Sequence, residues 1–292
     1  MLRSAHVSLL TSHFARGGAA PEQSIPGSGI LRVQNVRGKS VLTTAAAVSP
    51  LRLLQPKNAG SAAWVYAATF GGGLLGGDRI TLDVRVDAGA SALMSTQAST
   101  KVYRSELEAR QHLRVHAADD SLLVLLPDPV TPFAGSSYAQ DQQIDLDARA
   151  NLVAVDWMTA GRISSGERWQ FTSYASRTRI RRDGRLILHD ATQLNDDARG
   201  SVLVQRMSRF NCIAWAVAIG PALRTAAMRF AGALDGVPVP KRADLLLSCA
   251  PLEDDGVLLR VAGTSAQQVG AVLRQHLNFL PSLLGDDPWR RS

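Results

Sequence analysis

Strict alternation of apolar and polar residues is the feature that most limits the fold of this chain. It recurs between residue 30 and about residue 220, and it is clearest from Arg79 to Asp87, where every even position is apolar and every odd position is polar. Successive side chains of a strand point to opposite faces, so this pattern predicts strands with one buried and one solvated face. We therefore expect a mainly β protein.

A weaker pattern concerns how these strands are arranged. Segments 87–93, 117–123 and 147–153 follow one another at a spacing of 30 residues. Each ends an alternating strand, turns through small or polar residues and begins an apolar strand. Recurrence at such a period is typical of stacked, layered β-sheets in a solenoid-like β-helical arrangement. Chance similarity of residue class is the alternative.

The ends of the chain differ from this middle part. Residues 1–29 contain Arg, Ser, Thr and Ala, resemble a transit peptide only weakly, and end in a Pro-Gly-Ser run, so we expect a disordered tail followed by a single β-rich domain over 30–292.

Helical periodicity appears only late. It follows the candidate N-cap Ser265 and ends before Pro281, and a shorter stretch covers 224–234, with strand-like patterning over 244–262 between them. Two helices near the C-terminal end are predicted.

Charge and cysteine content narrow the function classes. The net charge is +7, and much of it comes from arginines within the Arg-rich segment 162–185, which includes the predicted hairpin 169–190 with its Asp183-Gly184 turn. This basic segment has three explanations, namely a solvated strand face, an acidic protein partner or nucleic acid, and no nucleic-acid motif supports the third.

Cys212 and Cys249 form no CxxC and suit a reducing, cytoplasmic compartment. No apolar stretch is long enough for a membrane span.

The glycine-rich string 71–78 matches GxGxxG, but it does not predict a dinucleotide site. The motif requires a helix after the glycines, whereas the cleanest alternating strand of the chain follows here. The glycines more plausibly let two backbone segments approach closely and leave Asp78 at the head of a strand. The string comprises Gly71, Gly72, Gly73, Gly76, Gly77 and Asp78.

Catalytic and metal-binding patterns are sparse. His112 and His116 would lie about 13 Å apart on a strand, so they cannot share one ion, and no dedicated high-affinity metal site is predicted. Asp156 and Glu167 flank a Gly-rich stretch and could be the paired carboxylates of a glycosidase. The aromatic content of 5% offers few sugar platforms, so this β-rich carbohydrate-active enzyme and a basic nucleic-acid-binding protein are kept only as alternatives.

Four segments in register resemble the urease accessory protein UreD family, also called UreH. They are Gly-Gly-Gly-Leu-Leu-Gly-Gly-Asp at 71–78, Thr-Gln-Ala-Ser-Thr-Lys-Val-Tyr-Arg-Ser at 96–105, Leu-Pro-Asp-Pro-Val-Thr-Pro-Phe-Ala-Gly at 126–135, and Asp156 with Gly161-Arg162 and Gly166-Glu167. The resemblance covers about residues 30 to 285. It implies a β-rich fold of stacked sheets with a few helices.

The resemblance also implies a function without catalysis. Such proteins bind apo-urease and the accessory proteins UreF and UreG, and they help nickel to reach urease without retaining a cofactor. A cation in transit must be held weakly, which scattered oxygen ligands achieve better than a Cys/His cage. The matching motif positions make Asp78, Asp156 and Glu167 candidates for the lining of a nickel path. Where a further acid is expected late in the hairpin, this chain has His189 followed by Asp190.

The remaining motif positions are expected to be architectural or to face a partner. Besides the glycines of the 71–78 string, they are Lys101, Tyr103, Arg104, Gly161 and Arg162.

Overall fold

The structure is a computed structural model that describes residues 25–195, 202–232, 240–252 and 256–290. Most of the predicted tail, residues 1–24, lies outside the described residues. Residues 25–29 are part of the fold, because the amide of Gly27 donates to Ser49 O at 3.0 Å and its carbonyl accepts from Thr81 N at 2.9 Å. The first strand begins at Ser28. The domain therefore includes residues that the sequence analysis assigned to the tail.

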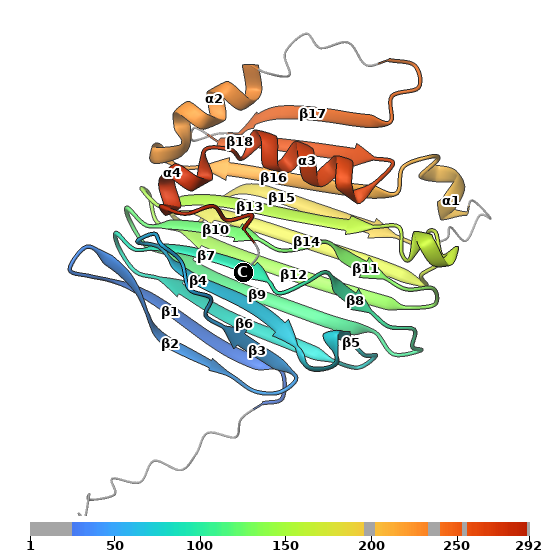
Figure 1. Cartoon of the computed structure of the whole chain (residues 1–292), viewed down its shortest axis with the longest axis horizontal. Coiled ribbons are helices and arrows are strands. Elements are labelled where there is room, and N and C mark those ends of the chain that lie inside the picture. The colour runs from blue at the N-terminus through green and yellow to red at the C-terminus, as the bar shows by residue number, and fades with distance from the viewer. Residues whose placement is uncertain (1–24, 196–201, 233–239, 253–255, 291–292) are drawn as a thin grey trace, which may run out of the picture.

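Sheet A forms one layer of the molecule (Figure 1). Its spatial order is β15 (Arg185–Leu194), β14 (Ser173–Arg182), β12 (Ser137–Leu146), β9 (Ala109–Ala117), β6 (Arg79–Val86), β1 (Ser28–Val36) and β2 (Lys39–Ala47). The central neighbours β14, β12, β9, β6 and β1 are parallel, and an antiparallel hairpin closes each edge. The predicted period of two is clear in β6 and β14, whose even residues are buried.

Sheet B forms the second layer. Its main order is β17 (Leu245–Leu252), β18 (Gly256–Gly263), β16 (Cys212–Ile219), β13 (Asn151–Thr159), β10 (Leu122–Leu126), β7 (Ser91–Thr96), β4 (Ala63–Thr69) and β3 (Leu51–Leu54). The short strands β11 (Val130–Pro132), β8 (Thr100–Val102) and β5 (Gly73–Leu74) extend it at one end. Strand β10 is buried along its whole length, as expected for a parallel strand covered on both faces.

In the repeated part of the chain, each long strand of sheet A is followed by a strand of sheet B, which confirms the layered arrangement predicted from the repeat. The chain passes from β6 to β7, from β9 to β10 and from β12 to β13, each time from sheet A to sheet B. In sheet B, Leu122 of β10 lies opposite Ser91 on one side and Asn151 on the other. The repeated segments therefore stack directly on one another, and their strands β7, β10 and β13 pair in parallel.

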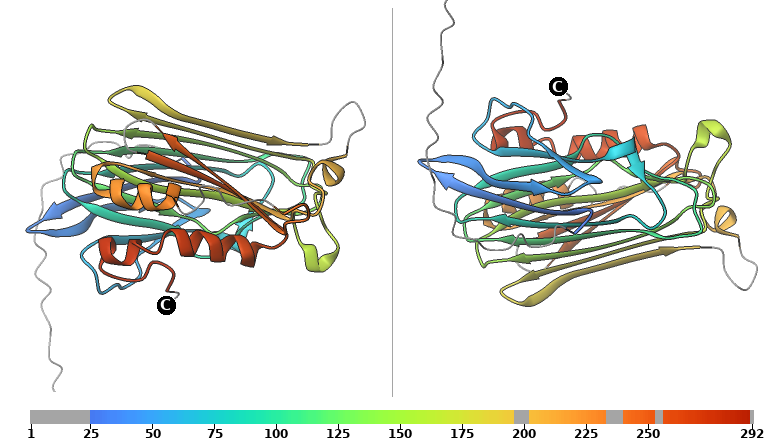
Figure 2. Two further views of the ribbon diagram at one scale, coloured as in Figure 1. Left: turned by 90° about the horizontal axis from the view of Figure 1, so that it is seen from above. Right: turned by 90° about the horizontal axis from the view of Figure 1, so that it is seen from below.

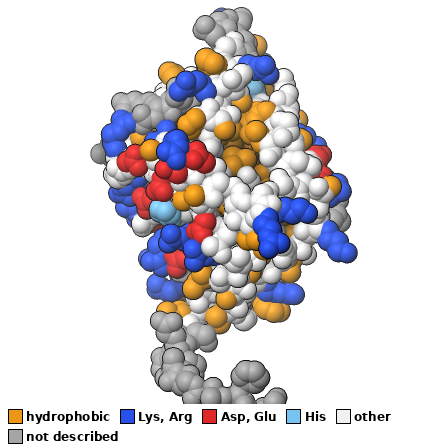
Figure 3. Space-filling model, turned by 90° about the vertical axis from the view of Figure 1, so that its left-hand side faces the viewer, with side chains coloured by type: hydrophobic (Ala, Val, Ile, Leu, Met, Phe, Trp, Pro, Cys, Tyr) orange, Lys and Arg blue, Asp and Glu red, His pale blue; other side chains and the backbone are white. Residues whose placement is uncertain are grey.

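The turns between the sheets are tied together along this stack. Gly89 N donates to Asp119 O at 3.1 Å, and Asp120 N donates to Arg149 O at 3.3 Å, so each turn is bonded to the next. Figure 3 views this end of the molecule, where acidic and basic side chains gather along one side. The close contact between turns fixes the register of the strands that leave them.

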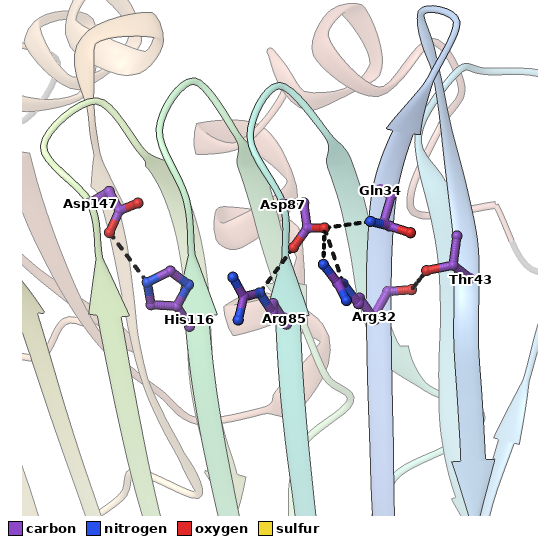
Figure 4. A network of polar contacts seen from close by, with 7 residues as sticks. All are labelled: Arg32, Gln34, Thr43, Arg85, Asp87, His116 and Asp147. Carbon is purple, nitrogen blue, oxygen red and sulfur yellow. Dashed lines mark hydrogen bonds and ion pairs between the residues drawn. The ribbon is translucent and has the colours of Figure 1, made fainter.

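Side chains on the outer face of sheet A extend this network (Figure 4). Asp87 accepts hydrogen bonds from Arg32 and Gln34 on the neighbouring β1 and from Arg85 on β6, the strand that Asp87 follows, at 2.7–3.1 Å, and His116 lies 3.2 Å from Asp147. Burial alone would raise the pKa of Asp87, but these hydrogen bonds outweigh it and lower the pKa below its ordinary value. The outer face is therefore held by cross-strand pairs between charged side chains.

Two apolar cores lie on either side of sheet B. One fills the space between the sheets, and the other lies between sheet B and the helices, where Val124 and Val155 meet Val269 and Leu273. Figure 2 shows α3 and α4 on the side of sheet B that faces away from sheet A. The helices are α1 (Leu203–Arg206), α2 (Arg224–Gly232), α3 (Ala266–His276) and α4 (Leu280–Leu284), with short 3-10 turns η1 (Phe70–Gly72), η2 (Ile163–Ser165) and η3 (Pro221–Leu223).

The C-terminal helices agree with the sequence in position but not in every boundary. Ser265 caps α3 as predicted, since its hydroxyl accepts from Gln268 N at 3.2 Å. The helix ends at His276, and Pro281 lies in the first turn of α4 rather than ending a longer helix. Proline is tolerated there because the first-turn amides have no partner within the helix. The prediction over 224–234 becomes α2, with its last two residues outside the described part. The short α1 was not predicted.

Candidate functional site

The four motif segments meet at one end of the stack. Strand β5 pairs with β8, β8 with β11, and β11 with β13, all in parallel. Gly73 therefore lies opposite Lys101, and Lys101 lies opposite Thr131. Segments that are 28 to 30 residues apart in the chain become neighbours because successive layers of the stack lie in register.

The glycine string allows a close approach between strands, as the sequence analysis proposed. A Cβ at Gly73 would lie 2.7 Å from Lys101 O, and one at Gly76 would lie 1.8 Å from Ser105 Oγ. Gly71, Gly72 and Gly77 adopt positive φ angles of 71° to 88°. The string leads into the strand β6 and not into a helix, so it lacks the helix N-terminus on which a dinucleotide site depends.

Asp78 closes the turn at the end of this string. Its carboxylate accepts from Leu75 N at 2.8 Å, while its own amide donates to Leu75 O at 3.1 Å. The side chain is half-buried and lines neither of the two cavities described below. Among the described residues, Asp78 forms no ion pair with Arg104 or with Arg162, which binds Glu167 instead. The local hydrogen bond gives Asp78 a role in turn geometry.

Glu167 is held by a neighbouring arginine. Its carboxylate forms an ion pair with Arg162 and accepts from Ala134 N at 3.0 Å. The Arg162 guanidinium, followed by that backbone amide, lowers the pKa of Glu167 below its ordinary value. Arg162 also stacks 4.1 Å from the centroid of the Phe133 ring. Glu167 therefore joins the motif segments 126–135 and 161–167.

The other motif residues divide into buried and exposed groups. Tyr103 packs edge-on against Phe133 at 5.3 Å between ring centroids, and its hydroxyl donates to Gly71 O at 3.2 Å. Gly161, with φ 116°, lies where a Cβ would be 3.0 Å from Pro132 O. Lys101 and Arg104 are exposed. The architectural group thus contains Tyr103 and Gly161, and the exposed cations remain open to a partner.

Asp156 differs from the other predicted carboxylates because it is buried between the sheets, with 7% of its surface exposed. It is a polar residue on the inward face of β13, where Leu152, Ala154 and Met158 are apolar, and it receives hydrogen bonds from two residues of sheet A. Gln140 Nε2 and Ser176 Oγ each donate to Asp156 Oδ2 at 2.7 Å. Both donors are neutral, so no cation among these contacts balances the carboxylate charge.

Burial determines the ionisation of this carboxylate. It raises the pKa of Asp156 above the ordinary value, the hydrogen bonds from Ser176 and Gln140 act in the opposite direction, and the negative charge of Asp190 raises it further. Burial and the Asp156 charge also raise the pKa values of Tyr138 and Tyr174 far above the ordinary value, so both phenols stay neutral. A buried charge without a counter-ion attracts any cation that can reach it.

Two cavities meet at Asp156. The first, about 180 Å³, lies between the sheets and is lined by Gln111, Gln140 and Asp156 in its interior and by the exposed Gly72 and Gln97 towards the surface. The second, about 510 Å³, is lined by Asp156, Ser176, Asp190 and Thr192, with Ser248 and Arg260 exposed at its outer side. Asp156 is the residue that lines both cavities. Its carboxylate therefore lies at the boundary between two cavities that are otherwise lined by different residues.

The polar lining follows from strand register. In sheet A, Gln111, Gln140, Ser176 and Thr192 form one cross-strand row whose members line the two cavities. These residues were missed in the sequence analysis, although one signal was present. Gln140 and Gln142 occupy the even positions of β12, where the alternation otherwise places the apolar Ile144 and Leu146. Polar residues on the inward parity of a strand are such a signal.

The polar groups that line these cavities are mainly hydroxyl, amide and carboxylate groups, with His112 at the first cavity and Arg260 at the second. Among the residues that the structure describes, no group of three or more His, Cys, Asp or Glu side chains could hold a metal ion. His112 and His116 lie on strand β9, as expected, and not on a helix. No described helix is long and apolar enough to cross a membrane. The site can offer weak oxygen ligands, in succession, to a hydrated cation.

Comparison with known proteins decides the family. A family model described as UreD urease accessory protein matches residues 26–291. The chain belongs to the UreD family. A urease accessory protein UreD of Sorangium cellulosum is 51% identical over 265 residues, covering 91% of this chain and 84% of that protein. One from Anaeromyxobacter sp. is 41% identical, covering 94% and 93%, and a urease accessory protein D of Oryza sativa subsp. indica is 34% identical, covering 94% and 99%.

Membership of the UreD family confirms the predicted resemblance and an accessory role in relation to urease. The relatives are named as urease accessory proteins, which agrees with the expectation that the chain is not itself an enzyme. The geometry of the two carboxylates also argues against the glycosidase alternative. Glu167 is bound to Arg162 and lines neither cavity that Asp156 lines, so the two carboxylates do not face a shared cleft.

Proposed function

We propose that this UreD-family protein lets nickel reach apo-urease through its interior. In this proposal it acts in the cytoplasm as a scaffold between apo-urease and the accessory proteins UreF and UreG, and retains no cofactor itself. The observation that carries the proposal is the buried Asp156 carboxylate, which lines both cavities and has only neutral hydrogen-bond donors. A nickel ion is the cargo of this path.

The chemistry of the lining supports passage over storage. Nickel binds imidazole and thiolate ligands more firmly than amide and hydroxyl oxygens. Besides Gln, Ser and Thr side chains, the lining contains the carboxylates of Asp128, Asp156 and Asp190 and one imidazole, that of His112. Oxygen ligands therefore outnumber imidazole along the lining, and such a lining holds nickel weakly. The carboxylate lowers the cost of bringing a dication between two apolar layers. Conduction requires binding that is favourable enough for the ion to enter and weak enough for it to leave.

The arginines of the basic strand β14 give little support to the alternative that this protein binds nucleic acid. Arg177 and Arg179 both form ion pairs with Asp141, at 3.0 and 2.9 Å. Their charge is therefore partly neutralised within the sheet. The exposed cations Lys101 and Arg104, at the motif end, are better placed for contact with an acidic protein partner.

The substitution Asp156→Asn tests this function. The amide keeps the shape and a hydrogen-bond acceptor but removes the charge that attracts a dication. We expect nickel per urease active site to fall at least about tenfold, a change equivalent to about 1.4 kcal/mol, when purified protein is combined with UreF, UreG and apo-urease. Co-purification with these partners and the thermal midpoint should remain close to those of the wild type or above them.

Asp141→Asn provides a matched control. Asp141 is adjacent to Gln140 on β12 and similarly shielded, with 13% of its side chain exposed, but it points to the outer face. This variant should load nickel like the wild type. Normal nickel loading by a folded Asp156→Asn variant would remove the interior path from the account.

A further inference from the structure

Arg260 is the exception on an otherwise buried strand. Its neighbours Leu259 and Val261 on β18 are buried, whereas the Arg260 side chain is 55% exposed. Its guanidinium forms an ion pair across the layer boundary with Asp190 of β15, whose side chain is 7% exposed. Both residues line the second cavity. A half-exposed cation therefore covers a buried carboxylate at the outer side of that cavity.

Strand register keeps this cation away from Asp156. Asp156 lies opposite Trp215 of β16, and Trp215 lies opposite Arg260 of β18. Two strand spacings separate Asp156 from Arg260, roughly 10 Å, and the Trp215 side chain is buried between them. Arg260 therefore neutralises Asp190, at the outer side, and leaves Asp156 without a counter-ion.

A buried hydroxyl lies beside the ion pair. Thr178 of β14 is directly opposite Asp190 in the antiparallel pair of β14 and β15, and it is 1% exposed. Its Oγ1 has no hydrogen-bond partner among the residues that the structure describes. Directly opposite residues have Cβ atoms about 5 Å apart. If the guanidinium moves out to solvent, the Asp190 carboxylate and the Thr178 hydroxyl offer oxygens to another cation.

We propose that Arg260 is the displaceable counter-cation of the second cavity. It pairs with Asp190 while the cavity is empty and yields Asp190 to the passing dication, then returns when the dication leaves. This inference rests on the proposed function and adds the residue that sets how tightly the path holds its cargo. A buried carboxylate without a partner is strongly unfavourable, so without Arg260 the dication would become the partner of Asp190 and leave slowly.

Equilibrium dialysis of nickel against the purified protein in complex with its accessory partners tests the role of Arg260. We expect Arg260→Gln to bind nickel about tenfold more tightly than the wild type, a change of about 1.4 kcal/mol. Arg260→Lys, whose ammonium lacks the forked donors of guanidinium, should fall between the two. In the double variant Asp190→Asn/Arg260→Gln the gain should disappear.

Arg149→Gln is the matched control. Arg149 is 57% exposed and forms ion pairs with Asp119 and Asp120 at the turn end, away from the cavities. Its loss should leave nickel affinity unchanged. Equal affinities for the wild type, Arg260→Lys and Arg260→Gln would overturn the proposal. If Arg260→Gln does not fold, the comparison of the wild type with Arg260→Lys decides.

The nickel-loading assay separates this inference from the proposed function. If Asp156→Asn loads urease normally, the interior path fails, whatever the dialysis gives. If Asp156→Asn reduces loading as expected and the Arg260 variants bind nickel equally, the path stands and only the role of Arg260 is wrong.

Discussion

At the scale of single residues, the three predicted carboxylates have different partners. Asp78 is bound to a backbone amide of its own turn, and Glu167 is bound to Arg162. Among the residues that the structure describes, Asp156 has only neutral donors, namely Gln140, Ser176 and the backbone of Trp157. A charge whose partners are neutral and whose surroundings are buried lowers the stability of the folded protein. Asp156 therefore costs stability, as a residue retained for function does.

This cost predicts the effect of Asp156→Asn on stability. The folded-state pKa of Asp156 is raised above the unfolded value, so above that raised pKa the ionised form disfavours folding, and the penalty disappears as pH falls towards the unfolded pKa. The variant should gain at least about 2 °C in thermal midpoint at pH 7, roughly 1 kcal/mol for a chain of this size. The gain should shrink at pH 4. Calorimetry at the two pH values measures it, and a lower midpoint at pH 7 would show that the charge stabilises the fold.

Sequence reasoning could name Asp156 but could not separate it from Asp78 and Glu167. Its distinguishing property is the pair of residues that face it, Gln140 and Ser176, which come from other strands. Which strands face each other depends on the order in which the layers stack. The alternation of one strand cannot specify that order.

At the scale of elements, the glycine string packs closely against β8 and the segment that follows it. Gly76 approaches Ser105 and Leu107 so closely that a Cβ would lie 1.8 Å from Ser105 Oγ and 2.7 Å from Leu107 O. The contact joins the 71–78 and 96–105 segments. It places Gly72 and Gly73 on the lining of the first cavity.

Replacing this glycine should loosen that end of the stack. We expect Gly76→Ala to reduce the free energy of unfolding by about 1–3 kcal/mol, because the added methyl group must displace Ser105 or the backbone. Urea denaturation measures the change. Gly232→Ala serves as the control, since nothing lies within 4 Å of a Cβ there, and its effect should be within about 0.5 kcal/mol. Equal effects of the two substitutions would mean that the 71–78 segment has room to adjust.

The elements themselves were predictable wherever local chemistry determines them. Alternation identified β6, the Asp183-Gly184 turn adopts the positive φ angles that its residues favour, and Ser265 caps α3. Pro281 was misjudged because proline both ends one helix and begins the next, and the sequence alone does not distinguish the two. The antiparallel pairing of β14 with β15 confirms the predicted hairpin. The approach of β18 to β15, through Arg260 and Asp190, depends on the whole stack and could not be predicted.

At the scale of the whole molecule, the stacked layers explain how a β protein can contain a polar path. The rows of a parallel stack align equivalent positions, so a polar residue at the inward parity of one strand lies beside another on the next strand. Gln111, Gln140 and Ser176 form such a row, opposite Asp156 of the facing sheet. The apolar rows on either side keep the remainder of the interior closed.

The location of nickel inside the protein tests this account most directly. Crystals of the protein soaked in nickel salt would be measured at the nickel absorption edge. We expect an anomalous peak between the sheets, within coordination distance of the Asp156 carboxylate, and its loss in Asp156→Asn crystals. Peaks confined to the outer face of sheet A, at His112 or His189, with none beside Asp156, would contradict the central claim.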